Sequence, residues 1–508
     1  DTVQTGVWIG RKVGNPENKS YVAGVLNYSD TNGPSEKLDN GAGYNAWRQA
    51  TSGLAKTGFE VNGWLVDFMA YKDDGAFGIQ NANNHFRTGA GTAQSPYSYG
   101  ATGDWRIDPS QTDLWVMSGS KQWTSEQTTL FSLSHVKNHQ VLTTTSSVNN
   151  DNELTHINLR QHMDLGKTRV VLGGDFMHWH TPTGFNYFEN IEREEKTKGL
   201  FATVEQRLLN DRLTLDAGIR RDQVNVLHGL DYYTAGAQPP GGVNSPLIFQ
   251  NRVLPSAEFL SFGASYKLSS AWKATGRFST ANQASRNLNP MPGVTLGNDE
   301  QKKWEFGLAG VVNTWFNPSI NFFSREVKNE KSVKGFTYTT AANTIQSCRS
   351  SVATSVANNV NWNTTSDIVE CYGQDDTLRQ GIELVSTGQW SSSGNYRLGW
   401  THFTKLERVE LTTPKDIVDL SLSQDWGAYK FTGSAKHVSS YRGSANDASA
   451  YLGGYTRLDL GVGRNVRWKD LDWRVTGYVK NATDKKYETS NGVQDIGRVL
   501  GLEIVTKF

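Results

Sequence analysis

The sequence predicts an all-β protein: a membrane-spanning, antiparallel up-and-down β-barrel of about 22 strands, with short periplasmic turns and long extracellular loops. Three observations predict this fold. The chain ends on a strictly alternating segment, amphipathic hairpins recur along it, and its composition differs from that of a helical membrane protein. The strand number follows from the length, because a hairpin with its loop takes roughly 45 of the 508 residues. We expect residues 1–508 to form one transmembrane barrel domain.

The composition excludes a helical membrane protein. Only 37% of the residues are hydrophobic, mean hydropathy is -0.54, and no run approaches the roughly 18 apolar residues that a spanning helix needs. A barrel instead places lipid-facing residues at every second position, and 16 Trp and 19 Tyr suit aromatic girdles at the membrane interfaces. A soluble propeller would share the Gly and Trp content, but no repeat of about 40–50 residues is present. The net charge of +1 argues against nucleic acid as a partner.

Paired strands follow one another along the chain. Thr2–Lys12 is the first segment expected to form a barrel strand, although alternation stays irregular over the first part of the chain. Leu200–Leu208 and Leu213–Arg220 alternate apolar and polar residues around a short turn, as do Glu258–Leu268 and Trp272–Thr280. Tight turns are predicted at Leu165–Lys167, Asn210-Asp211, Ser269-Ser270, Asn313–Asn317, Ser391–Asn395, Trp426-Gly427 and Asn465–Leu471.

Long polar stretches separate these hairpins. In a compact soluble domain, so many long loops would count against the strand assignment. Short turns at one rim and long loops at the other are typical of an outer-membrane barrel. The predicted extracellular loops are Asp73–Ala101, Thr181–Thr197, His228–Pro255, Asn282–Asn298, Asn329–Leu378, Tyr441–Tyr451 and Tyr487–Gly497.

The last segment, Leu500–Phe508, has the pattern of a final barrel strand. Alternation places Leu502 and Ile504 on an apolar face for lipid and Glu503 on the opposite face for the lumen. We interpret Phe508 as the end of the barrel-closing strand and as its assembly signal. The sequence begins at Asp1 without the basic and apolar regions of a signal peptide, so we expect a mature or trimmed exported chain in the bacterial outer membrane.

The two cysteines, Cys348 and Cys371, lie in one polar segment rich in Ser, Thr and Asn. In an oxidising compartment a disulfide between them would close a loop of about two dozen residues and stabilise it by roughly 3 kcal/mol. The alternative is two free thiols. Neither spacing nor neighbours suggests a metal site.

Five stretches share their order and spacing with one known family. They are Leu200–Leu208 leading into Gly218-x-Arg220-x-Asp222, Leu254–Leu268, Asn298–Leu308 with Glu305-x-Gly307, Gly381-x-Glu383, and Asn481–Tyr487. In these stretches the chain resembles the C-terminal β-barrel of TonB-dependent outer-membrane receptors, of the siderophore-receptor type. Asp299 stands where the family usually has Pro, and residues 1–199 show only generic barrel character. Nothing in the chain resembles the family's N-terminal plug, which leaves a truncated chain, a separate plug or a divergent channel without a plug. Of these we expect truncation or a separate plug.

The resemblance implies a receptor that imports a scarce nutrient, by default a ferric siderophore. It implies as partners outer-membrane lipid and lipopolysaccharide, the small-molecule ligand, and the TonB-ExbB-ExbD system acting through a plug. Haem, a metal, cobalamin or an oligosaccharide are rival cargoes. A passive porin-like channel and a soluble or surface β-rich lectin or enzyme are rival classes. We expect no cofactor and no enzymatic activity. His135 and His139 have the spacing of a metalloprotease pair but lack its Glu and lie in a strand pattern.

Members of this family hold ligand with aromatic and charged side chains of the loops and the upper wall. Any single such residue has an ordinary alternative, namely loop packing or lipopolysaccharide contact. The candidates for substrate binding are Trp47, Arg48, His85, Arg87, Tyr97, Tyr99, Tyr187, Tyr232, Tyr233 and Arg286.

Met177-His178-Trp179-His180 is the most metal-like pattern in the chain. Alternation from Val170 places His178 and His180 on the lipid-side face. The ordinary interpretation is an interfacial girdle near the top of a strand. The alternative is a site for a transition metal or a metal chelate at the base of a loop.

Overall fold

The computed structural model describes residues 2–13, 20–33, 45–79, 105–143, 147–184, 192–231, 247–283, 297–339, 345–349, 368–407, 413–442, 451–468, 471–490 and 493–507. Twenty-three strands of this part form a single sheet. They are β1 (Thr2–Lys12), β2 (Tyr21–Thr31), β3 (Arg48–Val61), β4 (Trp64–Gly78), β5 (Arg106–Thr124), β6 (Gln127–Thr143), β7 (Ser147–Leu165), β8 (Thr168–Thr181), β9 (Arg193–Leu208), β10 (Leu213–Asp231), β11 (Leu247–Val253), β12 (Ala257–Lys267), β13 (Trp272–Gln283), β14 (Asp299–Gly310), β15 (Asn317–Thr339), β16 (Ile345–Arg349), β17 (Ile368–Ser391), β18 (Gly394–Glu407), β19 (Asp416–Trp426), β20 (Tyr429–Val438), β23 (Tyr455–Trp468), β24 (Leu471–Lys480) and β27 (Val499–Lys507).

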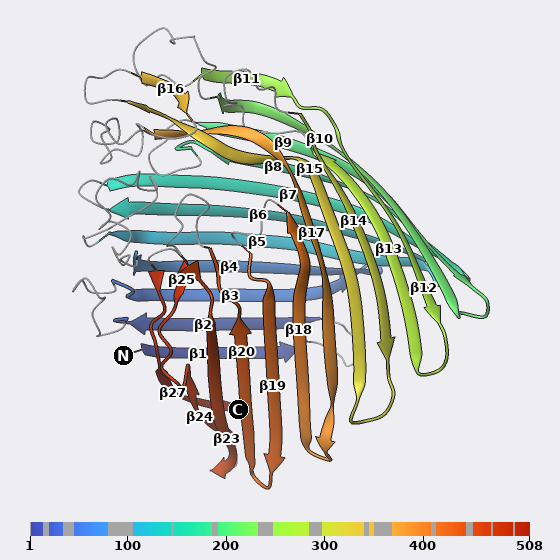
Figure 1. Ribbon diagram of the computed structural model, residues 1–508, viewed down its shortest axis with the longest axis vertical. Helices are drawn as coiled ribbons and strands as arrows, with labels where there is room; N and C mark the ends of the chain where they lie inside the picture. Colours follow the sequence, from blue (N-terminus) through green and yellow to red (C-terminus); the bar gives the residue numbers. More distant parts are fainter. Residues whose placement is uncertain are drawn as a thin grey trace.

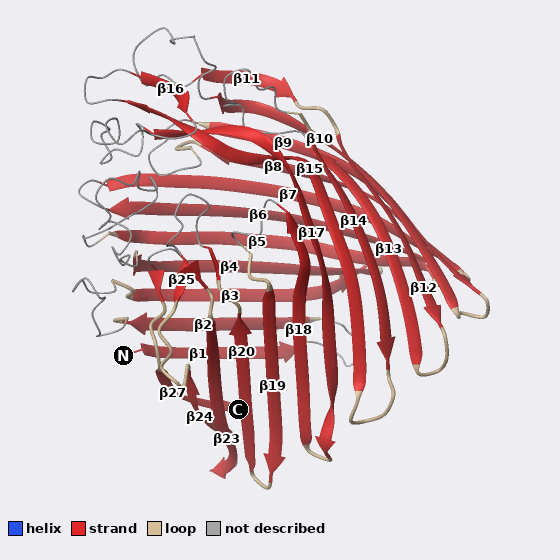
Figure 2. Cartoon of the chain, in the orientation of Figure 1, coloured by secondary structure: helices blue, strands red, loops and turns tan. Residues whose placement is uncertain are grey.

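Two small hairpins lie in the connections between wall strands. One pairs β21 (Tyr441–Arg442) with β22 (Tyr451–Leu452), and the other pairs β25 (Glu488–Ser490) with β26 (Val493–Gln494). Figure 2 shows strand as the regular structure throughout the described residues. None of these residues forms a helix long and apolar enough to cross a membrane.

The sheet is an up-and-down barrel. Successive strands pair antiparallel in chain order, and Figure 1 shows β1–β8 running across the view behind β13–β20. Two strands extend the wall at its extracellular rim, the end with the long connections: β11 pairs with the upper part of β10, and β16 pairs with the end of β15. The predicted fold of about 22 antiparallel strands is therefore confirmed. Among the described strands, β1 and β27 each pair on one side only.

The two faces of the wall differ in the way that lipid requires. Large apolar side chains are exposed on the outer face, for example Leu200 at 73% and Ile219 at 55%. Their neighbours along each strand, such as Phe201 and Arg220, point into the barrel. Few apolar residues of the described part are buried; Val224, Val226 and Leu254 form one small cluster. Exposed apolar residues on every second position are what a lipid-facing wall needs.

Tight turns close the periplasmic rim where the sequence predicts them. Positive φ angles at Asn210 (54°), Gly166 (66°) and Gly427 (59°) mark three of these turns. The sequence analysis missed the Asn62-Gly63 turn between β3 and β4, where both residues have positive φ, 49° and 76°. That dipeptide is the preferred type I′ hairpin turn, so the signal was present.

Several strands continue into segments that the sequence analysis assigned to loops. The predicted loop Asn329–Leu378 contains the end of β15, which has 23 residues, and the start of β17, which has 24. The predicted loops Thr181–Thr197 and His228–Pro255 likewise contain the start of β9 and the whole of β11. A tilted strand of 24 residues rises about 55 Å, whereas the apolar band of a barrel is about 25 Å tall. The upper halves stand in water on both faces, so apolar alternation no longer marks them.

The backbone does not support the predicted disulfide. Cys348 lies in β16 and Cys371 in β17, and these strands pair with opposite edges of β15. Because β15 lies between the two paired edges, the pairing does not bring Cys348 and Cys371 onto neighbouring strands, and the predicted disulfide is not supported. Phe508 lies outside the described residues. Its role in closure and assembly stays a prediction.

We predict that a charge on the outer face near mid-wall destabilises the barrel, whereas the same charge on the inner face does not. Ile219→Arg should lower the free energy of unfolding by about 2–4 kcal/mol, because the guanidinium faces hydrocarbon. Thr203 lies on the inner face of the neighbouring strand, next to Gly218 in register, so Thr203→Arg is the matched control. Denaturant unfolding in lipid vesicles measures both. Equal losses would contradict the assignment of the faces.

Candidate functional site

The inner wall carries a charged cluster built on the Gly218-x-Arg220-x-Asp222 pattern. Arg220 on β10 donates two hydrogen bonds to Asp175 on β8, from Nη1 at 2.7 Å and from Nη2 at 3.0 Å. Its Nε donates to Asp222 Oδ2 at 2.9 Å. Both carboxylates are mostly buried, with 10% and 15% of their side chains exposed. A guanidinium that is bidentate to one carboxylate and bonded to a second fixes three side chains, from β8 and β10, across the intervening β9.

A glycine on the middle strand makes room for this cluster. A Cβ at Gly199 on β9 would lie 2.4 Å from Asp222 Oδ1 and 2.6 Å from Arg220 Nη2, so no side chain fits there. Phe201, two residues along, has the guanidinium of Arg160 at 5.7 Å and that of Arg220 at 5.9 Å from its ring centre. The lumen at this height is therefore lined by fixed charges and one aromatic ring.

Other residues that carry the family resemblance also belong to the inner wall. Glu305 lies between the outward-facing Trp304 and Phe306, and its carboxylate accepts from Lys303 Nζ at 2.9 Å. Gly381 and Glu383 lie on the inner face of β17, where Gly381 pairs with the inward-facing Phe323. These positions therefore line the lumen.

The Asn481–Tyr487 stretch forms a hydrogen-bonded turn at the extracellular end of β24. Asn481 is 1% exposed, and its side chain both accepts from Lys485 N and donates to Lys485 O, each at 2.9 Å. The ring of Tyr487 stacks on Tyr455 at 3.9 Å between centres. Burial, with a further contribution from Asp495, raises the pKa of Tyr487 to about 12, so this phenol stays protonated.

Of the residues predicted to bind substrate, Trp47 and Arg48 lie in the described part. Trp47 is half-buried and its carbonyl accepts from Gly78 N at 2.9 Å. Arg48 begins β3 at the extracellular rim and is exposed. The remaining candidates, His85, Arg87, Tyr97, Tyr99, Tyr187, Tyr232, Tyr233 and Arg286, lie outside the described residues. The binding role of all ten stays a prediction.

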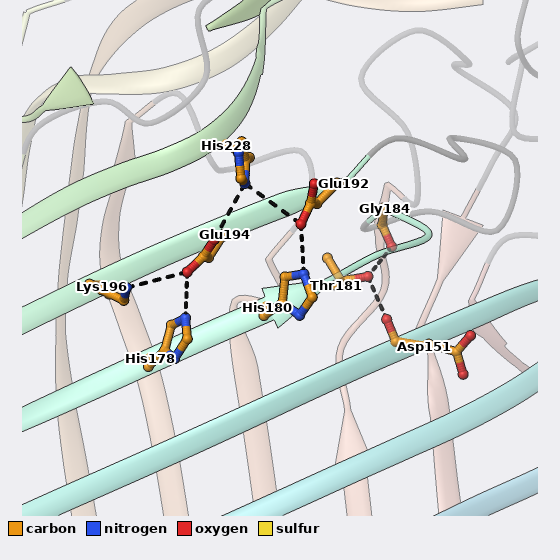
Figure 3. A network of polar contacts seen from close by, with 9 residues as sticks. All are labelled: Asp151, His178, His180, Thr181, Gly184, Glu192, Glu194, Lys196 and His228. Carbon is orange, nitrogen blue, oxygen red and sulfur yellow. Dashed lines mark hydrogen bonds and ion pairs between the residues drawn. The ribbon is translucent and has the colours of Figure 1, made fainter. Parts of the chain in front are cut away.

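A second cluster lies on the outer face at the extracellular ends of β8, β9 and β10. His178 Nε2 donates to Glu194 Oε1 at 2.7 Å, and His180 Nε2 donates to Glu192 Oε1 at 2.9 Å. His228 approaches from β10, with its Nδ1 3.3 Å from Glu194 Oε2 and 3.7 Å from Glu192 Oε1 (Figure 3). Three imidazoles thus surround two carboxylates, which the three-strand register brings together.

Strand position places this cluster at the edge of the apolar band. Outward from the periplasmic turn, β8 presents Val170, Leu172 and Phe176 on its outer face before His178 and His180. His178 lies about 23 Å up a tilted strand that begins at Thr168, close to the height of the band of about 25 Å. The predicted outward orientation of both histidines therefore agrees with the register of β8 and β9.

The sequence analysis missed Glu192, Glu194 and His228. The two glutamates repeat the period-two spacing of His178 and His180 across the β8–β9 connection, a signal that could have linked them. Both glutamates lie within the predicted loop Thr181–Thr197, for which the sequence predicts no facing strand. His228 was placed at the start of another loop.

Comparisons with known proteins agree on the barrel. A family model described as "TonB dependent receptor-like, beta-barrel" matches residues 18–482.

Among solved structures, the copper transporter OprC has a TM-score of 0.70 at 11% identity, over 99% of this chain and 79% of that chain. The closed form of the ferric-catecholate import receptor Fiu from E. coli K12 has a TM-score of 0.68 at 13% identity, over 99% of this chain and 80% of that one. BauA, the ferric preacinetobactin receptor from Acinetobacter baumannii, has a TM-score of 0.65 at 13% identity, over 99% and 78%. At these identities the likeness shows the fold alone. No curated protein sequence matches the chain.

We predict that Arg220→Ala destabilises the barrel by about 1–3 kcal/mol, because it leaves two largely buried carboxylates without their partner. Arg221→Ala is the matched control: Arg221 is 68% exposed on the opposite face, 3.9 Å from Glu258, and its loss should stay below about 0.5 kcal/mol. Denaturant unfolding in detergent micelles compares the two variants. An Arg220→Ala barrel as stable as the unaltered protein would show that the inner cluster contributes no stability.

Proposed function

Because the chain belongs to the TonB-dependent receptor β-barrel family, we propose that it imports a ferric siderophore across the outer membrane of a bacterium. The family match over residues 18–482 carries this proposal. Receptors of this family bind small-molecule ligands, interact with TonB, and are transporters rather than enzymes. The choice of cargo rests on the solved neighbours, two of which are named for ferric-catecholate and ferric preacinetobactin, whereas another is named for copper.

The inner wall supports transport of a polar, charged cargo. Arg220, Asp175 and Asp222 hold one another in place, so the charges along the lumen have fixed positions. Arg160 adds a guanidinium over the ring of Phe201 on the same face. Fixed guanidinium and carboxylate groups favour passage of a hydrated or chelated ion over that of an apolar molecule.

We also propose how the barrel meets its surroundings. The apolar outer face contacts lipid, and charged outer-face residues above it, such as Lys137 paired with Glu153 at 2.6 Å, face lipopolysaccharide. Residues 1–508 act as the barrel domain, and the TonB-ExbB-ExbD system supplies energy through a plug. Haem, a free metal, cobalamin and oligosaccharides are the rival cargoes, and a passive porin-like channel is the rival class.

The test is growth of a deletion strain on defined iron sources, with radioactive iron uptake measured for each ferric chelate. We expect the deletion strain to lose uptake of one class of ferric siderophore. Supplying the gene again should restore this uptake in a strain with active TonB. In a strain without TonB, the gene should not restore it. Immunoblotting of isolated outer membranes controls for expression in each strain. Unchanged uptake of every ferric chelate would exclude the siderophore cargo. A steady large single-channel conductance of the full-length protein would favour the porin-like class.

A further inference from the structure

We propose that the cluster at the extracellular ends of β9 and β10 is a binding site for a divalent transition-metal ion of the Zn²⁺ class. Glu192, Glu194 and His228 would be the ligands. The site lies on the outer face of the wall, apart from the lumen, so it is independent of the transported cargo. The ion would link the start of β9 to the extracellular end of β10.

The ligand atoms already have the spacing of a metal centre. One atom from each of the three residues lies within 4.8 Å of the others. His228 Nδ1 is 3.3 Å from Glu194 Oε2 and 3.7 Å from Glu192 Oε1. Ligand atoms of a tetrahedral zinc centre with bonds of about 2.0–2.2 Å lie about 3.4 Å apart. An ion can therefore bind at the centre of this triangle with small side-chain shifts.

His228 supplies a second, independent observation. Its Nδ1 atom is buried and has no hydrogen-bond partner, although two carboxylates face it. A buried polar atom without a partner is costly, and such atoms in native structures call for an explanation. A cation between Nδ1 and the two carboxylates satisfies all three groups together.

Two further histidines hold the carboxylates in orientation. His178 donates to Oε1 of Glu194, which leaves Oε2 directed at His228, and Lys196 Nζ lies 3.4 Å from the same Oε1. His180 donates to Oε1 of Glu192, the same oxygen that lies 3.7 Å from His228 Nδ1. Since a carboxylate accepts only, both imidazoles must carry their proton on Nε2. Hydrogen bonds of this kind to ligating groups fix their geometry and tune metal affinity.

The backbone is shaped to place His228 in the site. The pairing of β10 with β9 runs regularly to Val226 opposite Glu195, and then shifts so that His228 lies opposite Glu194. Leu227 is the extra residue of this β-bulge. Without it, His228 would face the lumen, because inner-face residues have even numbers along this part of β10. Bulges commonly redirect a side chain at a functional site.

The segment after His180 is also held firmly. Thr181 is fully buried, and the single proton of its hydroxyl is shared between the carbonyls of Asp151 and Gly184, the second at 2.8 Å (Figure 3). Asp151 N in turn donates to Thr183 Oγ1 at 2.8 Å. The start of the β8–β9 connection is thus tied to β7, and His180 is positioned before any ion binds.

The donor set selects the class of ion. Ca²⁺ and Mg²⁺ prefer oxygen ligands alone, in sixfold or higher coordination. One imidazole with two carboxylates suits Zn²⁺ and its first-row neighbours, with the fourth position open to water. Glu192 is 49% exposed, which gives an ion access from the extracellular side.

The test is Zn²⁺ binding to the purified full-length protein in detergent, measured by competition with a chromophoric chelator at pH 7.5. We expect saturable binding of one Zn²⁺ ion per chain. His228→Ala and Glu194→Gln should each weaken binding at least about 100-fold, because loss of a ligand exceeds the loss of a supporting partner. Heat-modifiable gel migration verifies that each variant remains a folded barrel.

The matched control is His437→Ala. His437 also lies on the outer face, at the extracellular end of β20, but its imidazole bonds Thr456 at 2.9 Å and no described carboxylate converges with it on a common ion. Its removal should leave Zn²⁺ affinity unchanged. The proposal fails if both site variants bind Zn²⁺ as the unaltered protein does, if His437→Ala weakens binding equally, or if the unaltered protein shows no saturable binding below about 1 mM. None of these outcomes depends on which cargo the barrel imports.

Discussion

The structure depends on one constraint: in hydrocarbon, no water is present to satisfy the hydrogen bonds of the backbone. Each strand must therefore pair with a neighbour along its membrane-crossing length, and the register between successive wall strands runs without interruption there. The side chains of a paired strand can point only toward one face of the sheet or toward the other. Lipid contacts one face of the wall, so the other face is available for charged groups such as Arg220 and Asp175.

The same constraint explains how much of the fold the sequence predicts. Within the apolar band, lipid imposes alternation, and segments such as Leu200–Leu208 and Trp272–Thr280 were located correctly together with their turns. Beyond the band, both faces meet water and alternation is no longer needed. The upper parts of β15 and β17 keep their backbone pairing but lose the pattern, which is why the sequence analysis interpreted them as loop.

The candidate sites were predictable to a smaller degree. The Gly218-x-Arg220-x-Asp222 pattern could be recognised, but its partner Asp175 comes from another strand and needs the register of β8 with β9 and β10. The outward orientation of His178 followed from alternation alone. The position of His228 could not follow from it, because one extra residue in β10 reverses the direction in which every later side chain points.

The long strands at the extracellular rim also determine what the cell displays. A wall that continues some 30 Å beyond the hydrocarbon is a rigid, hydrogen-bonded surface rather than a fringe of loops. Antibodies, phages and bacteriocins that approach the bacterium would meet an ordered sheet there, with side chains at fixed spacings. Because this part of the wall is released from the demands of lipid, its outward residues can change in sequence while the barrel beneath them keeps its pairing.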